Sequence, residues 1–562
     1  MSFSWVDRQM AFNALADSMI DVLVLGGGVV GASTAAHAAQ MGMRTTLVER
    51  EDLAFGASGN STGLAHAGLR YLAQGSVAYV FHESRERDRL EEIAPHWVRP
   101  FRFFLPIYRD DPFPFWQVSL GTWIYDLMGW SDAILRGRPL QRRHRALNAE
   151  ELCEHVPGLE RNGLQGGVEY FVDAKLQDSR FTMGWAKLAA AHGARIITYA
   201  DISGLDPTTE SLQTLLCTDR LSGKSVQFRT PLVINATGAW IDETRKPMGL
   251  TQDVTMPSKG IHLIVDHITS NPMIFNAKPK GRVFFVIPIG TDSSLVGTTD
   301  RLVQGPIDPV APDSQEVDEL IRLLFQFFPY FKQGSSLNES IELFRKIHVR
   351  DIFWGIRPLL RQSTDTLHAS REHRLLKENK TFWSIPGVKL TSGRSVGLEV
   401  AQAAWKAIHA REEKCPKLPF TPLPGGDIPD FDRYVQEAQR RFKLDEPSDN
   451  VNMIAYLISM YGTDYLKVIT LAYEDPANHE RLIPEEPWIP AQAIYAAQEE
   501  MVLSLNDFLW RRTKWAHLRE LPDAAVLRIA KAMAGPMNWS TAEIDSQMTR
   551  YYQERQRHRL ID

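Results

Sequence analysis

The first clear pattern in the chain is a short apolar run that ends in glycines and is followed by small residues. The sequence Asp-Val-Leu-Val-Leu-Gly-Gly-Gly-Val-Val-Gly over Asp21–Gly31 predicts a buried strand and a tight turn. The small residues of Ala32–Met41 predict a helix, and Thr45–Glu49 predicts a second strand that ends in an acid. Together these elements indicate a β-α-β unit with parallel strands.

Further along the chain, short apolar runs alternate with longer helical patterns. Strands are expected over 166–172, 192–199 and 231–240, helices over 178–192 and 314–328, and a β-rich region over 254–300. A strand, a loop and a helix are expected over 382–409, with the helix beginning near Ser395. Residues 416–429 are rich in Pro and Gly and predict a linker, and the remainder of the chain has a helical pattern.

Three glycines after the first strand have the Gly-x-Gly-x-x-Gly spacing of a dinucleotide-binding turn. Gly26 permits the tight turn, Gly28 lets the backbone approach a pyrophosphate, and Gly31 lets helix and strand pack closely. The helix N-terminus offers unpaired N–H groups to phosphates. Glu49, at the end of the second strand, is placed to accept hydrogen bonds from ribose hydroxyls. The segment therefore predicts a dinucleotide cofactor.

The composition is that of an ordinary globular protein and limits the classes of partner. The 562 residues, of which 44% are hydrophobic and 23% charged, suffice for roughly two to four domains. A net charge of −5 gives no general attraction to nucleic acid, so no such partner is expected. Cys153, Cys217 and Cys415 form no CxxC pair, so we expect neither a metal site nor a disulfide framework. The N-terminus lacks a signal-peptide pattern, which favours the cytoplasm.

Several segments spread along the chain carry residues typical of one family. They are Gly56–Tyr71, Lys259–His262, Gly297–Asp300, Gly355–Leu359, Ser370–Arg371, Gly387–Thr391 and Ser504–Lys514. In this order they resemble the FAD-dependent glycerol-3-phosphate dehydrogenases of the aerobic, quinone-linked type. The resemblance implies FAD as cofactor and oxidation of glycerol 3-phosphate to dihydroxyacetone phosphate, with hydride passing from C2 to flavin N5 and electrons passing on to membrane quinone.

The resemblance also implies an α/β fold with three parts. A Rossmann-like FAD-binding domain would be assembled from discontinuous segments, beside a β-rich substrate-binding cap domain and a C-terminal all-helical domain. The expected boundaries are 1–75, 166–245 and 351–415 for the FAD-binding domain, 76–165 for a cap or membrane-facing segment, 246–350 for the substrate domain, 416–429 for the linker and 430–562 for the helical domain.

Oxidation of a phosphorylated secondary alcohol needs an anion clamp, a base for the hydroxyl proton and an acceptor for hydride. The resemblance implies that Arg357 and Arg371 form the anion clamp, with Arg70 as a third candidate. A guanidinium group suits this role because it can bind two phosphate oxygens at once. Any one of these arginines alone is more typical of a surface ion pair. Their positions in the family-like segments favour the clamp.

Two histidines are candidates for the base. His66 follows a run of small residues, which lets its loop lie against a flavin ring, and a histidine accepts a proton near neutral pH. His262 is the rival base, or a group that polarises the forming ketone. For an isolated histidine, a structural role in a tight loop is the alternative.

Two lysines are candidates for stabilising negative charge. Lys389 is the stronger one, because it precedes a helix expected over about 395–410 whose N-terminus would also face the flavin. Lys259 is the second, and a solvated loop lysine is the alternative for Lys389.

The remaining candidates would bind the cofactor. They are Arg50, Ser58, Ser61, Thr62, Gly238, Leu390 and Thr391, besides Gly26, Gly28, Gly31, Glu49 and Lys389. The hydroxyl groups would bond the flavin phosphate or ring, and Gly238 follows a strand end that the adenosine side would pass. Turns and helix caps use the same residue types, so a structural role is the alternative.

Aromatic residues are concentrated between Trp97 and Trp130, and Pro112–Tyr125 carries no charge. Basic residues follow at Arg136, Arg138, Arg142, Arg143 and Arg145. Trp and Tyr favour the headgroup zone, and basic residues attract anionic lipid. The stretch therefore favours a monotopic membrane contact that admits quinone, on the inner face of the cytoplasmic membrane. A domain core or a subunit interface is the alternative.

Other functions remain open at this stage. The same fold could use oxygen as acceptor and release hydrogen peroxide, act on amines or amino acids, or serve as a non-catalytic flavin-binding scaffold. The C-terminal cluster Arg511, Arg512 and Lys514 is typical of a solvated helix face, with packing or homo-oligomer contact as the role of its domain.

Overall fold

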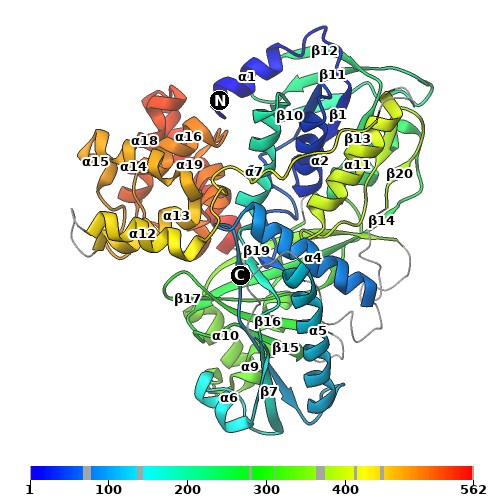
Figure 1. The fold of residues 1–562 in the computed structure, drawn as a ribbon. Helices are drawn as coiled ribbons and strands as arrows, with labels where there is room; N and C mark the ends of the chain where they lie inside the picture. Colours follow the sequence, from blue (N-terminus) through cyan, green and yellow to red (C-terminus); the bar gives the residue numbers. More distant parts are fainter. Residues whose placement is uncertain are drawn as a thin grey trace.

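The computed structural model describes residues 2–66, 77–135, 143–277, 282–308, 310–361, 374–409, 414–443 and 449–559. Figure 1 shows a layer of sheet and helices in the upper part of the molecule, a second sheet below it and a group of helices beside both. The expected α/β class and the helical C-terminal domain are confirmed.

The first sheet is built from strands that are far apart in the sequence. In the described part of the chain its order is β20-β21-β13-β1-β2-β9. The strands are β1 (Val22–Leu25), β2 (Thr45–Val48), β9 (Arg195–Ile197), β13 (Val233–Asn235), β20 (Leu376–Lys377) and β21 (Phe382–Ser384). All neighbours pair in parallel except β20 at the edge. The expected assembly from discontinuous segments is therefore confirmed.

Helices cover this sheet and explain its apolar strands. α2 (Val29–Gln40) packs against both α7 (Asp178–Ala191) and α11 (Gly393–Ile408). β1 and β2 are buried along their whole length, as parallel strands covered by helices are. The small residues of α2 let neighbouring backbones approach, so α11 lies directly on it.

A small antiparallel sheet adjoins the first one. It consists of β10 (Ala200–Ser203), β11 (Gln213–Asp219) and β12 (Ser225–Thr230). The N-terminal helix α1 (Trp5–Asn13) is held against this small sheet by a buried ion pair. The guanidinium of Arg8 on α1 lies 2.6 Å from the carboxylate of Asp219 at the end of β11.

The second sheet is larger and mostly antiparallel. Its strands are β5 (Phe103–Tyr108), β6 (Arg145–Leu147), β7 (Leu164–Tyr170), β14 (Thr255–Asp266), β15 (Met273–Ala277), β16 (Arg282–Ile289), β17 (Ser293–Gly297), β18 (Arg301–Leu302) and β19 (Val349–Leu360). The β-rich region expected over 254–300 is confirmed. However, β7 and β19 fall largely in ranges that we assigned to the FAD-binding domain, and both pair in this second sheet. Alternation of apolar residues identifies a strand and its buried face, but not the sheet it joins.

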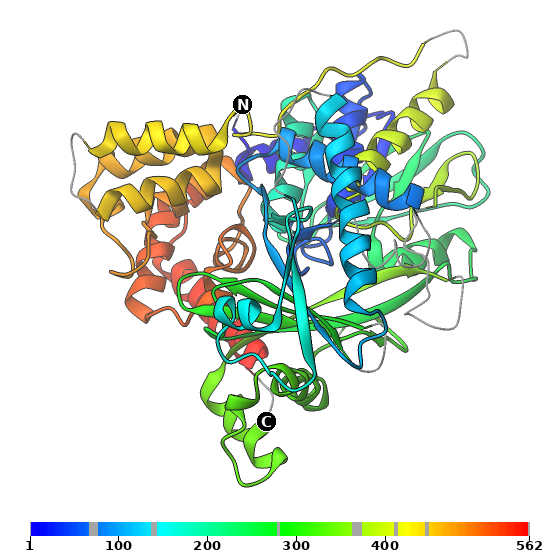
Figure 2. The same ribbon diagram turned by 60° about the horizontal axis from the view of Figure 1, so that its bottom comes forward.

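Helices cover both faces of the second sheet. α9 (Ser314–Phe327) and α10 (Leu337–His348) share a hydrophobic core with β14, β15 and β16, and Figure 2 shows them below the sheet. α5 (Phe115–Leu135) lies on the other side, where its buried Tyr125 packs with β5 and β7. Among the described residues, no helix combines the length and the apolar character needed to cross a bilayer.

The C-terminal domain is helical, as expected. Its helices are α12 (Phe431–Lys443), α13 (Asp449–Tyr461), α14 (Tyr465–Glu474), α15 (Pro476–His479), α16 (Ala491–Glu499), α17 (Trp515–Leu518), α18 (Asp523–Met537) and α19 (Thr541–Arg559), with a π-helix, η5, at Asp507–Arg512. The stacked rings of Trp488 and Trp515, 4.7 Å apart, lie in its core.

The interpretation of Arg511, Arg512 and Lys514 as a solvated face is wrong. The side chain of Arg512 is 1% exposed, and its guanidinium lies 2.8 Å from the buried carboxylate of Asp52 in the domain of the first sheet. Arg511 bonds the same carboxylate at 2.6 Å. These cations join two domains, because a carboxylate fully removed from water needs compensating charge and hydrogen bonds.

Replacing Gly397 by Ala is expected to destabilise the protein, because its new Cβ would lie 2.1 Å from the hydroxyl of Ser33 where α11 meets α2. Overpacking of this kind costs about 1–3 kcal/mol. The control is Gly535→Ala in α18, where no heavy atom lies within 4 Å and helix propensity favours Ala by about 1 kcal/mol. Thermal melting compares the two variants, and equal melting temperatures would contradict the close packing.

Candidate active site

Two adjoining pockets lie where the two large sheets meet. The first, of about 390 Å³, is lined by the turn after β1, the end of β2 and the turn at Gly238. The second, of about 310 Å³, is lined by residues between 57 and 66, by β14 and β19, and by 387–391. Both pockets share Ala57, Pro358, Val388 and Leu390, so they form one elongated cleft.

The turn after β1 tolerates only glycine at two positions. Gly26 has a φ of +104°, and a Cβ there would lie 2.6 Å from the carbonyl oxygen of Ala236. A Cβ on Gly31 would lie 1.9 Å from the carbonyl oxygen of Gly26. The turn therefore has the close backbone packing that the glycine spacing predicts.

The N-terminus of α2 faces the first pocket. Gly28 is the N-cap and brings no side chain to the exposed N–H groups, and it lines the pocket with Val29. Ser58, from the loop after β2, accepts a hydrogen bond from the Val29 N–H at 3.0 Å. A helix N-terminus open to a pocket is a suitable site for a pyrophosphate.

Glu49 directly follows β2 and lies beside the start of this helix. Its carboxylate accepts hydrogen bonds from the N–H groups of Gly27, at 2.5 Å, and Glu51, at 2.8 Å. Burial raises the pKa of the Glu49 carboxyl, while these two bonds oppose the rise. Each oxygen keeps a second lone pair for a ribose hydroxyl. Arg50 also lines the pocket, with its guanidinium 5.3 Å from the ring of Trp240. The donors and the glycine cradle fit the adenosine diphosphate part of FAD.

Arg357 is the cation of β19 that lines the second pocket. Its Nη2 donates to the hydroxyl of Thr298 at 2.9 Å, and its Nη1 donates to the carbonyl of Thr299 at 3.2 Å. The carboxylate of Asp300 lies 3.7 Å from Nη1. Gly260 leaves room for the guanidinium, because a Cβ there would lie 2.2 Å from Nη2. These contacts hold the group in one orientation beside the pocket.

His262 is a buried and neutral member of the same pocket. Its Nε2 lies 3.0 Å from the hydroxyl of Thr62, and its ring stacks on Phe353 with centroids 4.8 Å apart. A Cβ on Gly297 would lie 2.5 Å from the imidazole, so this glycine makes room for the ring. Burial, aided by the charges of Arg357 and Lys514, lowers the pKa of His262 to about 3.

His66 and Lys389 also line the second pocket, together with Leu390 and Thr391. The ammonium of Lys389 lies 4.5 Å from the ring centroid of Tyr79, and residues 389–391 directly precede α11. Burial raises the pKa of Glu83, and Lys389 opposes that rise through its charge. The structure therefore brings a cation and a helix N-terminus to one wall of the pocket.

One predicted residue does not join the described site, and two others lie outside the described residues. Lys259 lines neither pocket, because its ammonium lies 2.5 Å from the buried carboxylate of Glu316 and donates to the Ala311 carbonyl. Arg70 and Arg371 lie outside the described residues. The expected catalytic role of Lys259 in stabilising negative charge at the site is therefore wrong, since its ammonium is bound to Glu316 within the second domain.

Sequence reasoning missed several residues that line or support the second pocket. Asp300 belongs to the family-like segment 297–300 and so had a signal, whereas Tyr170 and Asp173 had none. Asp178 supports the pocket from behind, accepting hydrogen bonds from the backbone N–H of Ser61 at 3.1 Å and from its hydroxyl at 2.8 Å.

Comparison with known families agrees with this geometry. Residues 21–402 match the family described as FAD dependent oxidoreductase. Residues 420–544 match the C-terminal domain of alpha-glycerophosphate oxidase. The chain therefore belongs to the FAD dependent oxidoreductase family, and FAD as its cofactor is confirmed.

Individual relatives resemble the whole chain. A glycerol-3-phosphate dehydrogenase of Synechocystis sp. is 29% identical over 98% of this chain and 99% of its own length. An aerobic glycerol-3-phosphate dehydrogenase of Staphylococcus saprophyticus is 29% identical over 91% of this chain and 90% of its own. A similar solved structure is the X-ray structure of the glycerol-3-phosphate dehydrogenase from Bacillus halodurans, complexed with FAD. The two structures match with a TM-score of 0.76 and a sequence identity of 23%, and the match covers 100% of this chain and 99% of the Bacillus chain. This likeness establishes the fold.

Gly26→Ala is expected to lower the FAD content of the purified protein, because the new Cβ would press on the Ala236 carbonyl and shift the turn. The control is Gly42→Ala, which has a similar positive φ of +89° but no heavy atom within 4 Å. Both variants bear the cost of a left-handed alanine, roughly 1–2 kcal/mol, so only the clash separates them. Flavin absorbance per chain measures the outcome, and equal losses would contradict the cradle.

Proposed function

We propose that this chain oxidises sn-glycerol 3-phosphate to dihydroxyacetone phosphate. The supporting observation is the second pocket, where Arg357, Lys389 and two histidines line a space continuous with the dinucleotide cleft. Similarity to glycerol-3-phosphate dehydrogenases over nearly the whole chain supports the same substrate.

Arg357 would hold the substrate phosphate. A guanidinium fork binds phosphate oxygens bidentately, and its anchoring by Thr298 and Thr299 reduces the side-chain freedom lost on binding. Arg70 and Arg371 remain candidates for the same anion.

His66 would accept the proton of the C2 hydroxyl, because an imidazole can act as a general base at neutral pH. His262, whose pKa burial lowers to about 3, is a weaker proton acceptor and would instead orient Thr62 or polarise the forming ketone. When bound, FAD supplies the hydride acceptor at N5 of its ring. Lys389 and the N-terminus of α11 would stabilise negative charge on that side.

Arg357→Met is expected to raise KM for glycerol 3-phosphate roughly 10- to 100-fold, because a charge-assisted bond to phosphate is lost. Arg361→Met is the matched control, since Arg361 follows the same strand, is 51% exposed and lines neither pocket. Steady-state rates of dye reduction at varied glycerol 3-phosphate concentration give KM for both variants and the parent.

Failure of glycerol 3-phosphate to bleach the parent flavin, with dithionite still effective, would contradict the proposal and favour a flavin-binding scaffold. Bleaching by amino acids instead would favour an amine or amino-acid oxidase. Comparing quinone reduction with peroxide yield separates the dehydrogenase from the oxidase.

We also propose that α5 rests on the inner face of the cytoplasmic membrane and gives quinone access to the flavin. Large apolar side chains are exposed along one stripe of α5, at Trp116, Leu120, Trp123, Leu127 and Ile134. They recur at helical spacing, so they share a face. Trp at such a face favours the headgroup zone of a bilayer, and Arg143, exposed shortly after this helix, suits anionic lipid.

The double variant Trp116→Asp, Trp123→Asp is expected to abolish pelleting with anionic lipid vesicles and to lower activity with a membrane quinone. Activity with a soluble dye should be unchanged, because neither tryptophan lines a pocket. The control is Ile347→Asp on α10, which is also exposed but stands outside the stripe. Pelleting of the double variant at the parent level would refute the membrane contact.

A further inference from the structure

One short segment of the C-terminal domain contacts residues that support the second pocket, namely Asp178 and Phe353. Residues 513–514 connect the π-helix η5 with α17, and Lys514 is the N-cap of α17 with a φ of +56°. A non-glycine residue in the left-handed region costs about 1–2 kcal/mol, so its surroundings hold it in that conformation.

The first contact runs through Lys514. Its ammonium lies 2.5 Å from Oδ1 of Asp178, whose side chain is 1% exposed at the start of α7. Oδ2 of the same carboxylate accepts the two hydrogen bonds from Ser61. Ser61 and the following Thr62 line the second pocket. Lys514 thereby fixes the loop that carries Thr62.

The second contact runs through His517. Its ring lies 5.1 Å from the ring of Phe353, which in turn stacks on His262. Phe353 is buried between the two imidazoles. His517 thereby contacts the ring that stacks on His262, so the first contact leads to Thr62 and the second to its hydrogen-bond partner His262.

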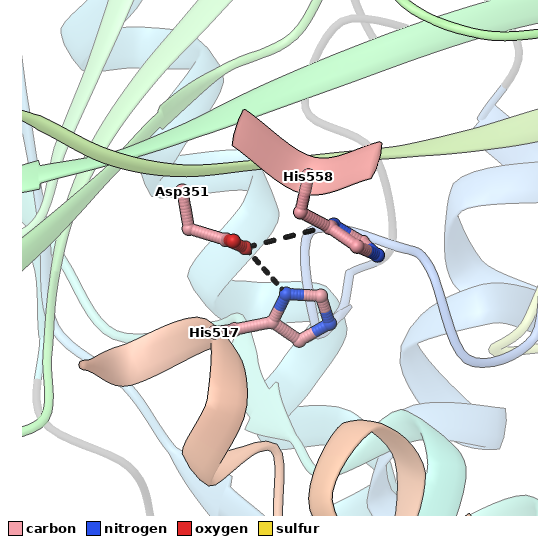
Figure 3. Close-up of side chains that lie close together, drawn as sticks. All are labelled: Asp351, His517 and His558. Carbon is pink, nitrogen blue, oxygen red and sulfur yellow. Dashed lines mark hydrogen bonds and ion pairs between the residues drawn. The ribbon is translucent and has the colours of Figure 1, made fainter. Parts of the chain in front are cut away.

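His517 is itself anchored by Asp351 of β19. Figure 3 shows the carboxylate of Asp351 facing both His517 and His558. Nδ1 of His517 lies 2.6 Å from Oδ2 of this carboxylate. Burial lowers the pKa of His517 to about 4, although Asp351 opposes this. The neutral ring therefore donates its Nδ1 proton to the carboxylate, since an ionised carboxylate only accepts.

The three residues of Figure 3 also have a composition suited to a metal ion, but their bonding favours an anchor. Nδ1 of His558 lies 2.7 Å from the carbonyl of Ile352 and donates to it. The guanidinium of Arg555 lies 3.6 Å from Oδ1 of Asp351 and supplies the positive charge that a cation would otherwise bring.

We propose that the C-terminal helical domain positions the Thr62–His262 pair of the active site, with Lys514 and His517 as positioning residues. Neither side chain lines the pocket, so each acts through another residue. The kinetic part of the test rests on the proposed function, whereas the structural part does not.

The decisive variant is Lys514→Met, which keeps the length of the side chain and removes its charge. Amide hydrogen exchange in the peptide covering 56–66 is expected to become at least about tenfold faster. The reason is that Asp178, which accepts the hydrogen bonds of Ser61, is no longer held by the ammonium of Lys514. The kcat for glycerol 3-phosphate is expected to fall about tenfold with KM within about twofold, since alignment is lost and the phosphate clamp is not. Lys514→Arg should restore both properties.

Arg519→Met is the matched control. Arg519 directly follows α17, is 28% exposed against 31% for Lys514, and pairs with Glu486 inside its own domain at 3.2 Å. Its loss should leave exchange over 56–66 and kcat at parent values. Should Lys514→Met fold poorly, Asp178→Asn tests the same contact, because the amide keeps an acceptor for Ser61 but loses the charge that Lys514 binds.

Unchanged exchange over 56–66 in the Lys514 and Asp178 variants would overturn the proposal. Equal changes in Arg519→Met would overturn it too, because they would indicate a general loosening of the domain. If the parent flavin is not reduced by glycerol 3-phosphate, the proposed function fails, while the exchange comparison still decides the positioning role.

Discussion

The structure depends on a backbone contact between its two large sheets that only glycine permits. At Gly355 of β19, a Cβ would lie 2.6 Å from the carbonyl oxygen of Asn60 in the loop after β2. Alternate residues of a strand face the same side, so Arg357 points to the same side as this contact. The distance between the Arg357 strand and the loop after β2 is therefore limited by a missing side chain. Gly260 and Gly297 likewise leave room, through their missing side chains, for the side chains of Arg357 and His262 respectively.

The parts of the fold that depend on neighbouring residues could be predicted from the sequence. The turn at Gly26–Gly31 is one, because backbone conformation and helix start are decided within a few residues. Lys259 could also have been judged by local reasoning. On β14, Lys259 pairs with Ile356 of the neighbouring strand β19. Gly260 pairs with Gly355 of β19, and His262 pairs with Phe353. Lys259 and His262 are three apart, so they face opposite sides of the strand, and only one of them can face the pocket.

Other parts depend on residues far apart in the chain, which a single sequence does not place. The strand β7 was recognised, but its pairing with β5 rather than with the first sheet was not. The cluster around Arg512 has the composition of a solvated helix face, and its partner Asp52 lies 460 residues away. Composition predicts burial poorly for cations, because a buried arginine is stable only where a specific carboxylate meets it.

This dependence on specific partners also explains how a chain with a net charge of −5 can hold two cations at one pocket. Among the described residues of the second pocket, Arg357 has Asp300 near it and Lys389 has Glu83 near it. The carboxylates lower the cost of holding positive charge away from bulk water before any substrate arrives. They also weaken the attraction for a passing anion, so binding depends on the directed hydrogen bonds of the guanidinium and ammonium groups. On the proposed function, selectivity for a phosphate of matching geometry would follow from that balance, because total charge alone would attract every anion equally.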